Sequence, residues 1–140
     1  MILIGGEPRA AGRGIDVGEA VGFALLERGG DGGPWLLGWG ESSDAHHMSS
    51  PHPLGRGARL AIEAALAGAA LSPAAVDYIN LHGTASQKND EVEAQVVADL
   101  FPVSTRASST KGWTGHALGA AGILEAVICL SALETGVVPG

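Results

Sequence analysis

Short apolar runs alternate with amphipathic segments in the second half of the chain, and this alternation constrains the fold more than any other feature. Residues 76–81 and 103–109 have the length and composition of buried strands, and residues 88–101 between them place valine and leucine at helical spacing. Two further segments, 57–71 and 115–135, are long and rich in alanine and leucine, which predicts helices. Helices that alternate with short strands imply a layered α/β domain.

The first forty residues are less regular. Residues 1–14 show no periodicity and are expected to form an irregular lead-in, so we expect the domain to span residues 15–140. Within it, the apolar runs 17–27 and 34–40 flank a glycine-rich turn. This pattern predicts a β-hairpin with a long connection.

The helix expected over 115–135 is apolar on nearly every side, which is typical of a buried helix. Residues 136–140 look like the start of a strand, and the chain stops there. We therefore expect a partial domain that is truncated before its final strands. An uncovered apolar helix favours self-association or a homodimer.

Charge and cysteine content exclude several classes of protein. Eight lysines and arginines stand against 15 acidic residues, the formal net charge is −7, and no basic run occurs, so nucleic acid is not an expected partner. The single Cys129 excludes an internal disulfide and fits a reducing compartment. No signal peptide and no uninterrupted apolar stretch near 18 residues is found, so we expect a cytoplasmic protein without a membrane span.

Two histidines are the strongest candidates for chemistry. His82 follows the strand-like run 76–81, and His116 precedes the long helix, whose N-terminal dipole favours a neutral imidazole. Ligands of open α/β sheets bind at the ends of strands, so both imidazoles are expected at one rim, where they could hold a developing oxyanion. A buried, hydrogen-bonded histidine at a strand end is the alternative for each, but the neighbouring glycines and hydroxyl residues favour a functional site.

Residues 41–55 hold three of the five histidines together with Asp44. Their spacing is irregular and enforces no coordination geometry, so no metal site is predicted. Cys129 lies among apolar neighbours in the middle of the expected long helix, where burial favours the inert thiol.

Three ordered motifs resemble the C-terminal half of β-ketoacyl-acyl carrier protein synthases, the condensing enzymes of the thiolase-like superfamily. They are HGTAS at 82–86, SSTKGWTGHALGAAG at 108–122 and ESSDAHHMSSP at 41–51. The resemblance covers about residues 13–140, and the residues following His82 look nearest to aryl-polyene-type synthases.

The resemblance implies a thiolase-like α/β/α fold with a mixed sheet. It implies decarboxylative Claisen condensation of an acyl thioester with malonyl-carrier protein, in fatty-acid, polyene or polyketide synthesis. Acyl carrier protein would be the partner and its phosphopantetheine arm the substrate carrier, with no bound cofactor.

The same resemblance assigns roles to individual residues. His82 and His116 correspond to the two active-site histidines, which stabilise charge during malonyl decarboxylation and on the thioester carbonyl. Lys111 corresponds to the family's active-site lysine, and Glu125 is its expected partner, because an unpaired buried lysine would be costly.

Other assigned positions lie along the expected path of the phosphopantetheine arm. Thr84 and Ser86 match hydroxyl residues that contact the arm, and Asp44 and His47 are placed near its tunnel. Asp90 matches an acidic position that either supports the histidine motif or caps the following helix.

One departure from the family pattern matters for activity. The family's nucleophile is a cysteine at a helix N-terminus in the N-terminal half, and the mid-helix Cys129 does not match it. The isolated chain is therefore expected to be inactive. A non-catalytic partner of the chain-length-factor type remains the alternative, although the presence of His82, His116 and Lys111 together favours an enzyme.

Overall fold

The computed structural model describes residues 15–30 and 32–140, so the predicted lead-in 1–14 lies outside the described residues. Four helices, two strands and two single-turn 3-10 helices follow one another along the described part. In chain order they are α1 (Arg56–Ala69), η1 (Pro73–Ala75), β1 (Tyr78–Asn80), α2 (Gln87–Leu100), β2 (Arg106–Ser108), α3 (Lys111–Thr114), η2 (Leu118–Ala120) and α4 (Ala121–Thr135). The predicted order of strands and helices from residue 57 onward is confirmed.

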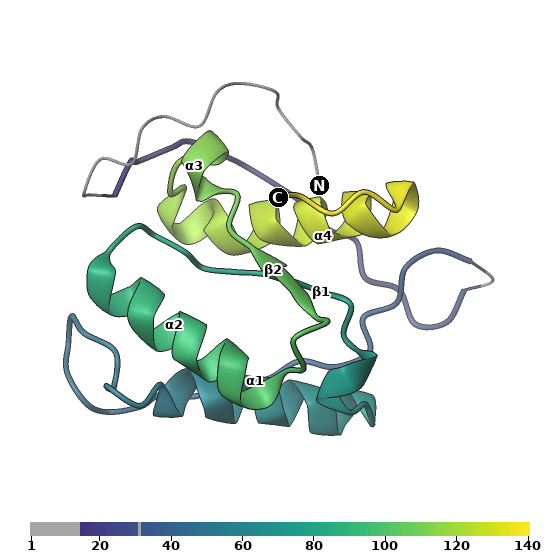
Figure 1. The fold of residues 1–140 in the computed structure, drawn as a ribbon. Helices are drawn as coiled ribbons and strands as arrows, with labels where there is room; N and C mark the ends of the chain where they lie inside the picture. The colour runs from purple at the N-terminus through teal and green to yellow at the C-terminus, as the bar shows by residue number, and fades with distance from the viewer. Residues whose placement is uncertain (1–14, 31) are drawn as a thin grey trace.

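Within the described residues, the sheet is a parallel pair and not the mixed sheet that the resemblance implied. Tyr78 of β1 lies opposite Arg106 of β2, and Asn80 lies opposite Ser108, with α2 as the crossover connection. Figure 1 shows α1 and α2 on one side of the strands and α4 on the other, which confirms the predicted α/β/α layers. Because the strands are parallel, the residues that follow each of them arrive at the same edge of the sheet.

The packed core lies between the sheet and α4. It consists of two buried residues of α4 and two partly buried residues beside them: Ile128, Ala132, Tyr78 and Leu124. A second contact joins the start of α1 to α2, where Val96 is 1% exposed. Gly55 has a φ of 58°, and a Cβ there would lie 2.1 Å from the Val96 side chain, so this position requires glycine.

The predicted hairpin of residues 17–27 and 34–40 is wrong. Apart from one isolated bridge at its start, neither segment forms a strand in the described residues. Each segment packs on a different helix: a Cβ on Gly22 would lie 2.7 Å from the α4 side chain Ile123, and one on Gly38 would lie 2.2 Å from a carbonyl oxygen of α1. Two segments held by different helices do not pair with each other.

The long helix predicted over 115–135 starts later than expected. Gly115 and Leu118 have φ values of 68° and 49°, in the left-handed region, and this interrupts the helix until Ala121. The turn η2 separates His116 from the regular helix α4, and the expected effect of the helix dipole on this imidazole stays a prediction. Three α4 residues are buried, Ala121, Ile128 and Ala132, whereas Leu133 is 72% exposed. Within the described residues, this apolar helix is therefore covered on one face only, as the sequence analysis expected.

Residues Leu118–Thr135 form an 18-residue stretch with a mean hydropathy of 1.6, long and apolar enough to cross a membrane by length and composition alone. Glu125 and Glu134 lie within it, so it is not the uninterrupted apolar stretch whose absence was expected. Core helices of soluble proteins pass the same criterion. The regular helix α4 has 15 residues, or about 22 Å at 1.5 Å per residue, which is shorter than a hydrocarbon core of about 30 Å.

Candidate active site

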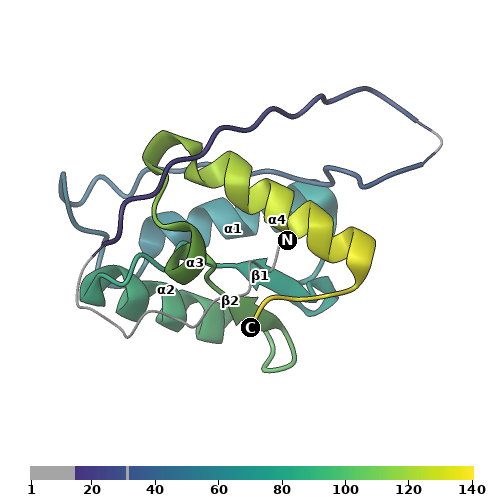
Figure 2. The same cartoon turned by 90° about the horizontal axis from the view of Figure 1, so that it is seen from above.

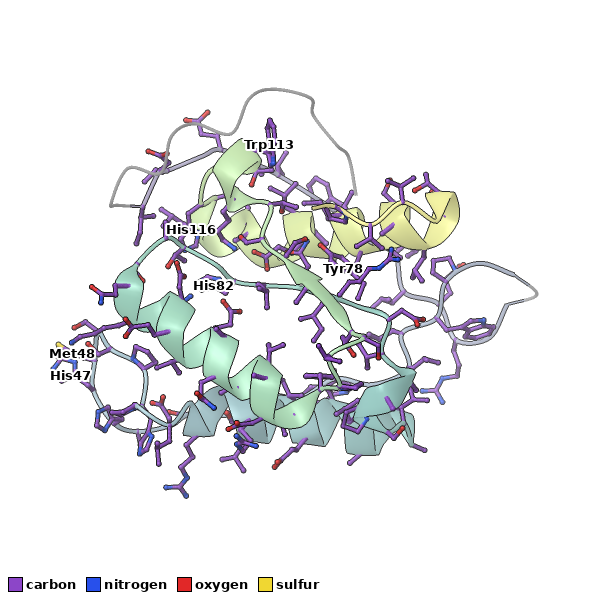
Figure 3. The ribbon with its side chains drawn as sticks, in the orientation of Figure 1. His47, Met48, Tyr78, His82, Trp113 and His116 are labelled. Atoms are coloured by element: carbon purple, nitrogen blue, oxygen red, sulfur yellow. The ribbon has the colours of Figure 1, made fainter. Side chains whose placement is uncertain are left out.

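The edge of the sheet brings the two predicted histidines together. His82 lies two residues after the end of β1, and His116 lies between α3 and η2. Their ring centroids are 5.1 Å apart, and the ring planes meet at 87°. Figure 3 shows the two side by side above the start of α2. The prediction that both imidazoles share one rim is confirmed.

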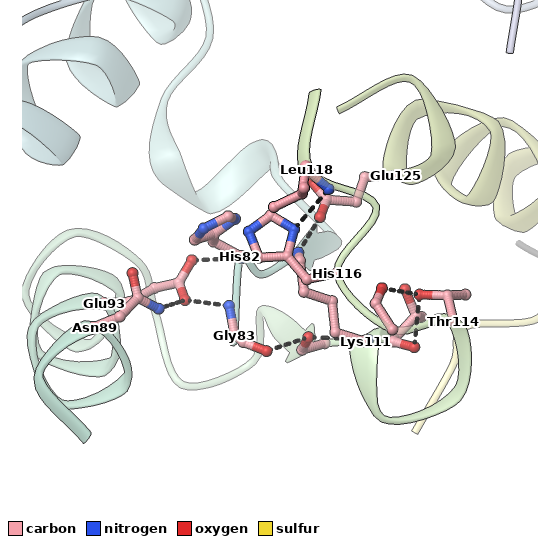
Figure 4. Close-up of polar contacts among 12 residues, drawn as sticks. His82, Gly83, Asn89, Glu93, Lys111, Thr114, His116, Leu118 and Glu125 are labelled. Carbon is pink, nitrogen blue, oxygen red and sulfur yellow. Dashed lines mark hydrogen bonds and ion pairs between the residues drawn. The ribbon is translucent and has the colours of Figure 1, made fainter. Parts of the chain in front are cut away.

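Glu93 of α2 holds the backbone turn that carries His82. Its Oε1 accepts a hydrogen bond from the His82 N–H at 2.7 Å, and its Oε2 accepts one from the Gly83 N–H at 2.8 Å (Figure 4). Both donors would otherwise be unpaired at the end of the strand. The sequence analysis missed Glu93, because nothing in the sequence distinguishes it from the exposed Glu91 two residues earlier.

Asp90 connects to this carboxylate through Asn89. The Asn89 side-chain amide donates to Asp90 Oδ1 at 3.1 Å and to Glu93 Oε2 at 3.3 Å. Ser86 occupies the N-cap of α2, and Asp90 lies inside the first turn, so Asp90 is not the helix cap. Its remaining predicted role is to support the histidine motif. Asp90 acts at one remove, because it contacts Asn89, and Asn89 in turn contacts the Glu93 carboxylate that holds the His82 turn.

Backbone contacts fix His116 from two sides. Its N–H donates to the Asp16 carbonyl at 2.6 Å, and its carbonyl accepts from the Gly18 N–H at 3.1 Å. The Leu118 N–H donates to Nδ1 of the imidazole at 3.1 Å. An Nδ1 that accepts a hydrogen bond carries no proton, so the neutral ring is protonated at Nε2. His116 therefore offers an N–H donor from the opposite side of its ring.

A buried ion pair lies behind the histidines. Lys111 is 8% exposed, and its Nζ pairs with Oε1 of Glu125, which confirms the predicted partnership. Lys111 begins α3 and Glu125 belongs to α4, so the pair joins the two helices that flank His116. A buried ammonium without this partner would be strongly destabilising.

The surroundings of His82 favour its neutral form. Loss of solvent around the ring is the largest cause that lowers the pKa of His82, and the Lys111 ammonium acts in the same direction. The carboxylates of Glu125 and Glu93 oppose these effects without reversing them. Both leading causes disfavour imidazolium. At neutral pH, the rim therefore carries an uncharged His82.

Two hydroxyl groups follow His82 at the same edge. Thr84 is 7% exposed, and its Oγ1 lies 3.0 Å from Oγ of Ser86. Ala85 between them has a φ of 62°, and this turn brings the two side chains together. The structure therefore places Thr84 and Ser86 beside the histidines. Their contact with a phosphopantetheine arm stays a prediction.

Asp44 and His47 are not brought to this rim. Figure 3 shows His47 well apart from His82 and His116, on a loop at the left edge of the view. The Asp44 carboxylate accepts a 2.9 Å hydrogen bond from the His52 N–H, which closes the loop and holds the pKa of Asp44 below its usual value. In this structure, Asp44 shapes its own loop, and the predicted place of both residues near the tunnel stays a prediction.

Cys129 lies in α4, partly buried, and burial raises the pKa of its thiol. The prediction of an unreactive cysteine in the body of the helix agrees with this position. Within residues 15–30 and 32–140, no group of three histidine, cysteine or acidic side chains is arranged to hold a metal ion.

Comparisons with known proteins agree with this geometry. Residues 35–140 match the family model for the C-terminal domain of β-ketoacyl synthases. The mitochondrial 3-oxoacyl-[acyl-carrier-protein] synthase of Arabidopsis thaliana is 40% identical over 138 residues, which cover 90% of this chain and 30% of that relative.

Solved structures agree as well. A chain in the complex of a ketosynthase with its chain length factor from Xenorhabdus doucetiae is 56% identical with a TM-score of 0.69, and the match covers 71% of this chain and 25% of that one. A type II polyketide acyl carrier protein in complex with its ketosynthase, bound to the hexaketide, gives 32% identity and a TM-score of 0.66, with the same coverage of both chains.

The layers, the paired histidines and these matches define a thiolase-like domain of the condensing-enzyme class. The chain belongs to the β-ketoacyl synthase family, and it contains that family's C-terminal domain. It spans 30% of the Arabidopsis relative and 25% of the Xenorhabdus chain.

Removing the Glu93 carboxylate should loosen the His82 turn. We expect Glu93→Ala to lower the free energy of unfolding by about 1–3 kcal/mol, because it leaves two backbone donors without their charged acceptor. Glu93→Gln, which keeps one acceptor oxygen, should lose less. Urea unfolding measures both, with the exposed Glu91→Gln as the matched control. Equal stability of Glu93→Ala and the control would show that solvent replaces the carboxylate.

Proposed function

We propose that this chain is the C-terminal part of a β-ketoacyl-acyl carrier protein synthase, which condenses an acyl thioester with malonyl-carrier protein. The observation that carries the proposal is the pair of imidazoles at one edge, 5.1 Å apart, with the proton of His116 on Nε2. Within the family, we assign the chain to the aryl-polyene group. The 56% identity with the Xenorhabdus complex, against 40% with the Arabidopsis enzyme, supports that assignment.

The proposed chemistry uses the imidazoles as hydrogen-bond donors. When malonyl thioester loses CO2, the electron pair of the broken C–C bond moves into the thioester and forms an enolate oxyanion. Nε2–H of His116 and an N–H of neutral His82 donate to that oxygen. The enolate carbon then attacks the enzyme-bound acyl thioester, a C–C bond forms, and the cysteine thiolate leaves. That nucleophilic cysteine comes from the family's N-terminal domain.

Lys111 and Glu125 hold the geometry in this proposal. Their ion pair joins α3 to α4 across the turn that carries His116, so its imidazole keeps one orientation. After the loss of solvent around the ring, the lysine charge is the second cause that lowers the pKa of His82 and favours its neutral form. Both effects preorganise the donors before charge develops on the substrate.

The proposed partner is acyl carrier protein, whose phosphopantetheine arm brings the substrate. Thr84 and Ser86 present adjacent hydroxyls beside the histidines, which suits amide groups of such an arm. The related ketosynthase solved with its acyl carrier protein supports this choice of partner. The arm is a substrate carrier, and the proposal requires no resident cofactor. The free thiol of Cys129 fits the cytoplasm as the compartment.

A chimaera tests the proposal against the chain-length-factor alternative. Residues 35–140 would replace the matching segment of the ketosynthase in the Xenorhabdus complex, and the 56% identity with a chain of that complex supports this choice of host. We expect the chimaera to load acyl groups and to release CO2 from malonyl-carrier protein. A folded chimaera that loads acyl groups without decarboxylating malonyl thioester would favour the non-catalytic partner.

The chain by itself should show no condensation, because its only thiol is partly buried within α4 with a raised pKa. An assay with acyl- and malonyl-carrier protein measures this, with the intact Xenorhabdus complex as the positive control. Cys129→Ser should change nothing. Turnover that disappears in Cys129→Ser would contradict both the proposal and the assignment of this thiol.

A further inference from the structure

The segments that carry the two histidines follow adjacent parallel strands, and their backbones stop pairing just before His82. The last hydrogen bond of the ladder runs from the Leu81 N–H to the Ser108 carbonyl at 2.8 Å. Beyond it, no backbone–backbone bond in the described part of the chain joins residues 82–86 to residues 109–114. Figure 2 shows α3 just beyond β2, at the same end of the strands as the start of α2. A hydrogen bond between the two segments therefore requires a side chain.

The hydroxyl of Ser109 spans this gap. Its O–H donates to the Gly83 carbonyl at 3.0 Å, and its oxygen accepts from the Lys111 N–H at 3.3 Å. A hydroxyl has one proton and free lone pairs, so it can make both bonds at once. The bond to Lys111 is a local turn that serine often forms. The bond to Gly83 is not local, because it joins residues that are 26 positions apart.

The contact is close because position 83 is a glycine. A Cβ on Gly83 would lie 2.3 Å from the Ser109 Cβ and 2.6 Å from its Oγ, and the φ of Gly83 is +39°. The Gly83 N–H donates to Glu93 of α2, while its carbonyl accepts from Ser109. The residue that follows His82 is therefore held by α2 on one side and by the segment after β2 on the other.

The same hydroxyl leads to His116 through the backbone of Lys111. The Lys111 carbonyl accepts a hydrogen bond from the Gly115 N–H at 2.9 Å, and Gly115 directly precedes His116. A run of hydrogen bonds thus leads from the residue after His82 to the residue before His116. Ser109 is the link between the two halves of this run.

We propose that Ser109 is a positioning residue: its hydroxyl holds the turn after His82 against the segment that leads to His116, and so sets the 5.1 Å spacing of the two rings. Two donors act together only when they point at one oxygen, and a misplacement of about 1 Å can lower a rate about 100-fold. The effect of Ser109 on catalysis rests on the proposed function, whereas the ring spacing can be measured without turnover.

The test compares two neighbouring, partly buried serines in the full chain. Ser109→Ala removes the link, whereas Ser108→Ala removes a hydroxyl that bonds instead to the Tyr78 hydroxyl and the Pro139 carbonyl. Rings with centroids 5.1 Å apart should show a nuclear Overhauser effect between their protons. We expect Ser109→Ala to lose or weaken this signal and Ser108→Ala to keep it at the parent's strength.

The pKa of His82, measured by NMR titration, is a second readout that a general loss of stability would not move. Burial and the Lys111 charge lower this pKa, so a turn that moves away from α3 should titrate closer to the ordinary 6.5. Ser108→Ala should titrate as the parent does. Ser109→Ala itself changes none of the titratable groups that face the ring: Lys111, Glu125, Glu93 and His116.

Ser109→Cys covers the case in which the alanine variant does not fold. Its thiol is close in size to the hydroxyl and donates only weakly, so both NMR changes should appear in reduced form. In the ketosynthase chimaera, Ser109→Ala should lower kcat for CO2 release by about 10-fold with little change in KM, because it disturbs the orientation of donors that act in the transition state.

An unchanged ring signal and an unchanged His82 pKa in the Ser109 variants would overturn the positioning role. Equal changes in Ser108→Ala would overturn it as well, and so would an unchanged kcat of Ser109→Ala in an active chimaera. If the NMR changes appear as expected while the parent chimaera releases no CO2, the positioning role stands and the proposed function fails.

Discussion

Replacing His82 or His116 by alanine is expected to lower malonyl decarboxylation by about 100-fold or more in the ketosynthase chimaera, the scale of losing one oxyanion donor. Acyl loading should fall less, because the nucleophile lies in the other domain. Release of CO2 and transfer of the acyl group would be measured separately. His46→Ala, an exposed histidine away from the rim, is the matched control.

The pH profile distinguishes a chemical role from a structural one. The pKa of His82 lies below its ordinary 6.5, so decarboxylation that needs neutral His82 should persist to pH values below 6.5. Lys111→Gln removes a positive charge that lowers this pKa, so the acid limb should move to higher pH. If both histidine variants decarboxylate normally, the imidazoles are structural and the proposed function fails.

Breaking the Lys111–Glu125 pair should cost about 3 kcal/mol in the free energy of unfolding, because one charge is left buried without a partner. Lys111→Met and Glu125→Leu should each show this loss, and the double variant should lose less than their sum. Urea unfolding at a fixed protein concentration measures the cycle.

The exposed Arg59–Asp99 pair is the matched control. Its side chains are 31% and 43% exposed, and pairs of this kind contribute about 1 kcal/mol or less. If the losses in unfolding free energy of the two single variants simply add up in the double variant, Lys111 and Glu125 are not coupled. The proposal that their ion pair orients His116 would then be wrong.

Local patterns predicted the elements from residue 57 onward because periodicity and propensity determine them. The helix predicted over 57–71 is α1, and the one predicted over 88–101 is α2, with ends shifted by no more than two residues. The strands were also expected in place, although each is shorter than its apolar run. Burial alone does not show how much of an apolar run finds a backbone partner.

The hairpin was wrong for a related reason. Residues 17–27 and 34–40 have strand composition, but pairing depends on where their glycines dock. The helices on which these glycines pack, α4 and α1, come later in the sequence, so a local pattern does not reveal the contact. The late start of α4 was also hidden, because only the backbone angles at Gly115 and Leu118 interrupt an otherwise helix-compatible run.

The residues of the site that belong to sequence motifs could be predicted. The residue that holds the backbone of a motif in place could not. The meeting of His82 and His116, and the pairing of Lys111 with Glu125, were expected and are confirmed. Glu93 was missed, because a carboxylate that accepts two backbone N–H groups has no sequence motif of its own.

The contact between the Leu118 amide and His116 allows the side chain at position 118 to change without loss of the hydrogen bond. The group that selects the imidazole tautomer is a main-chain N–H, and the Leu118 side chain is 65% exposed. An alanine scan that passes through position 118 would therefore report it as dispensable. Glycine there would even relieve the positive φ of 49° while keeping the donor. Only proline at position 118 would remove this N–H donor. The position of the proton on His116 therefore depends on the course of the backbone and not on the identity of a side chain.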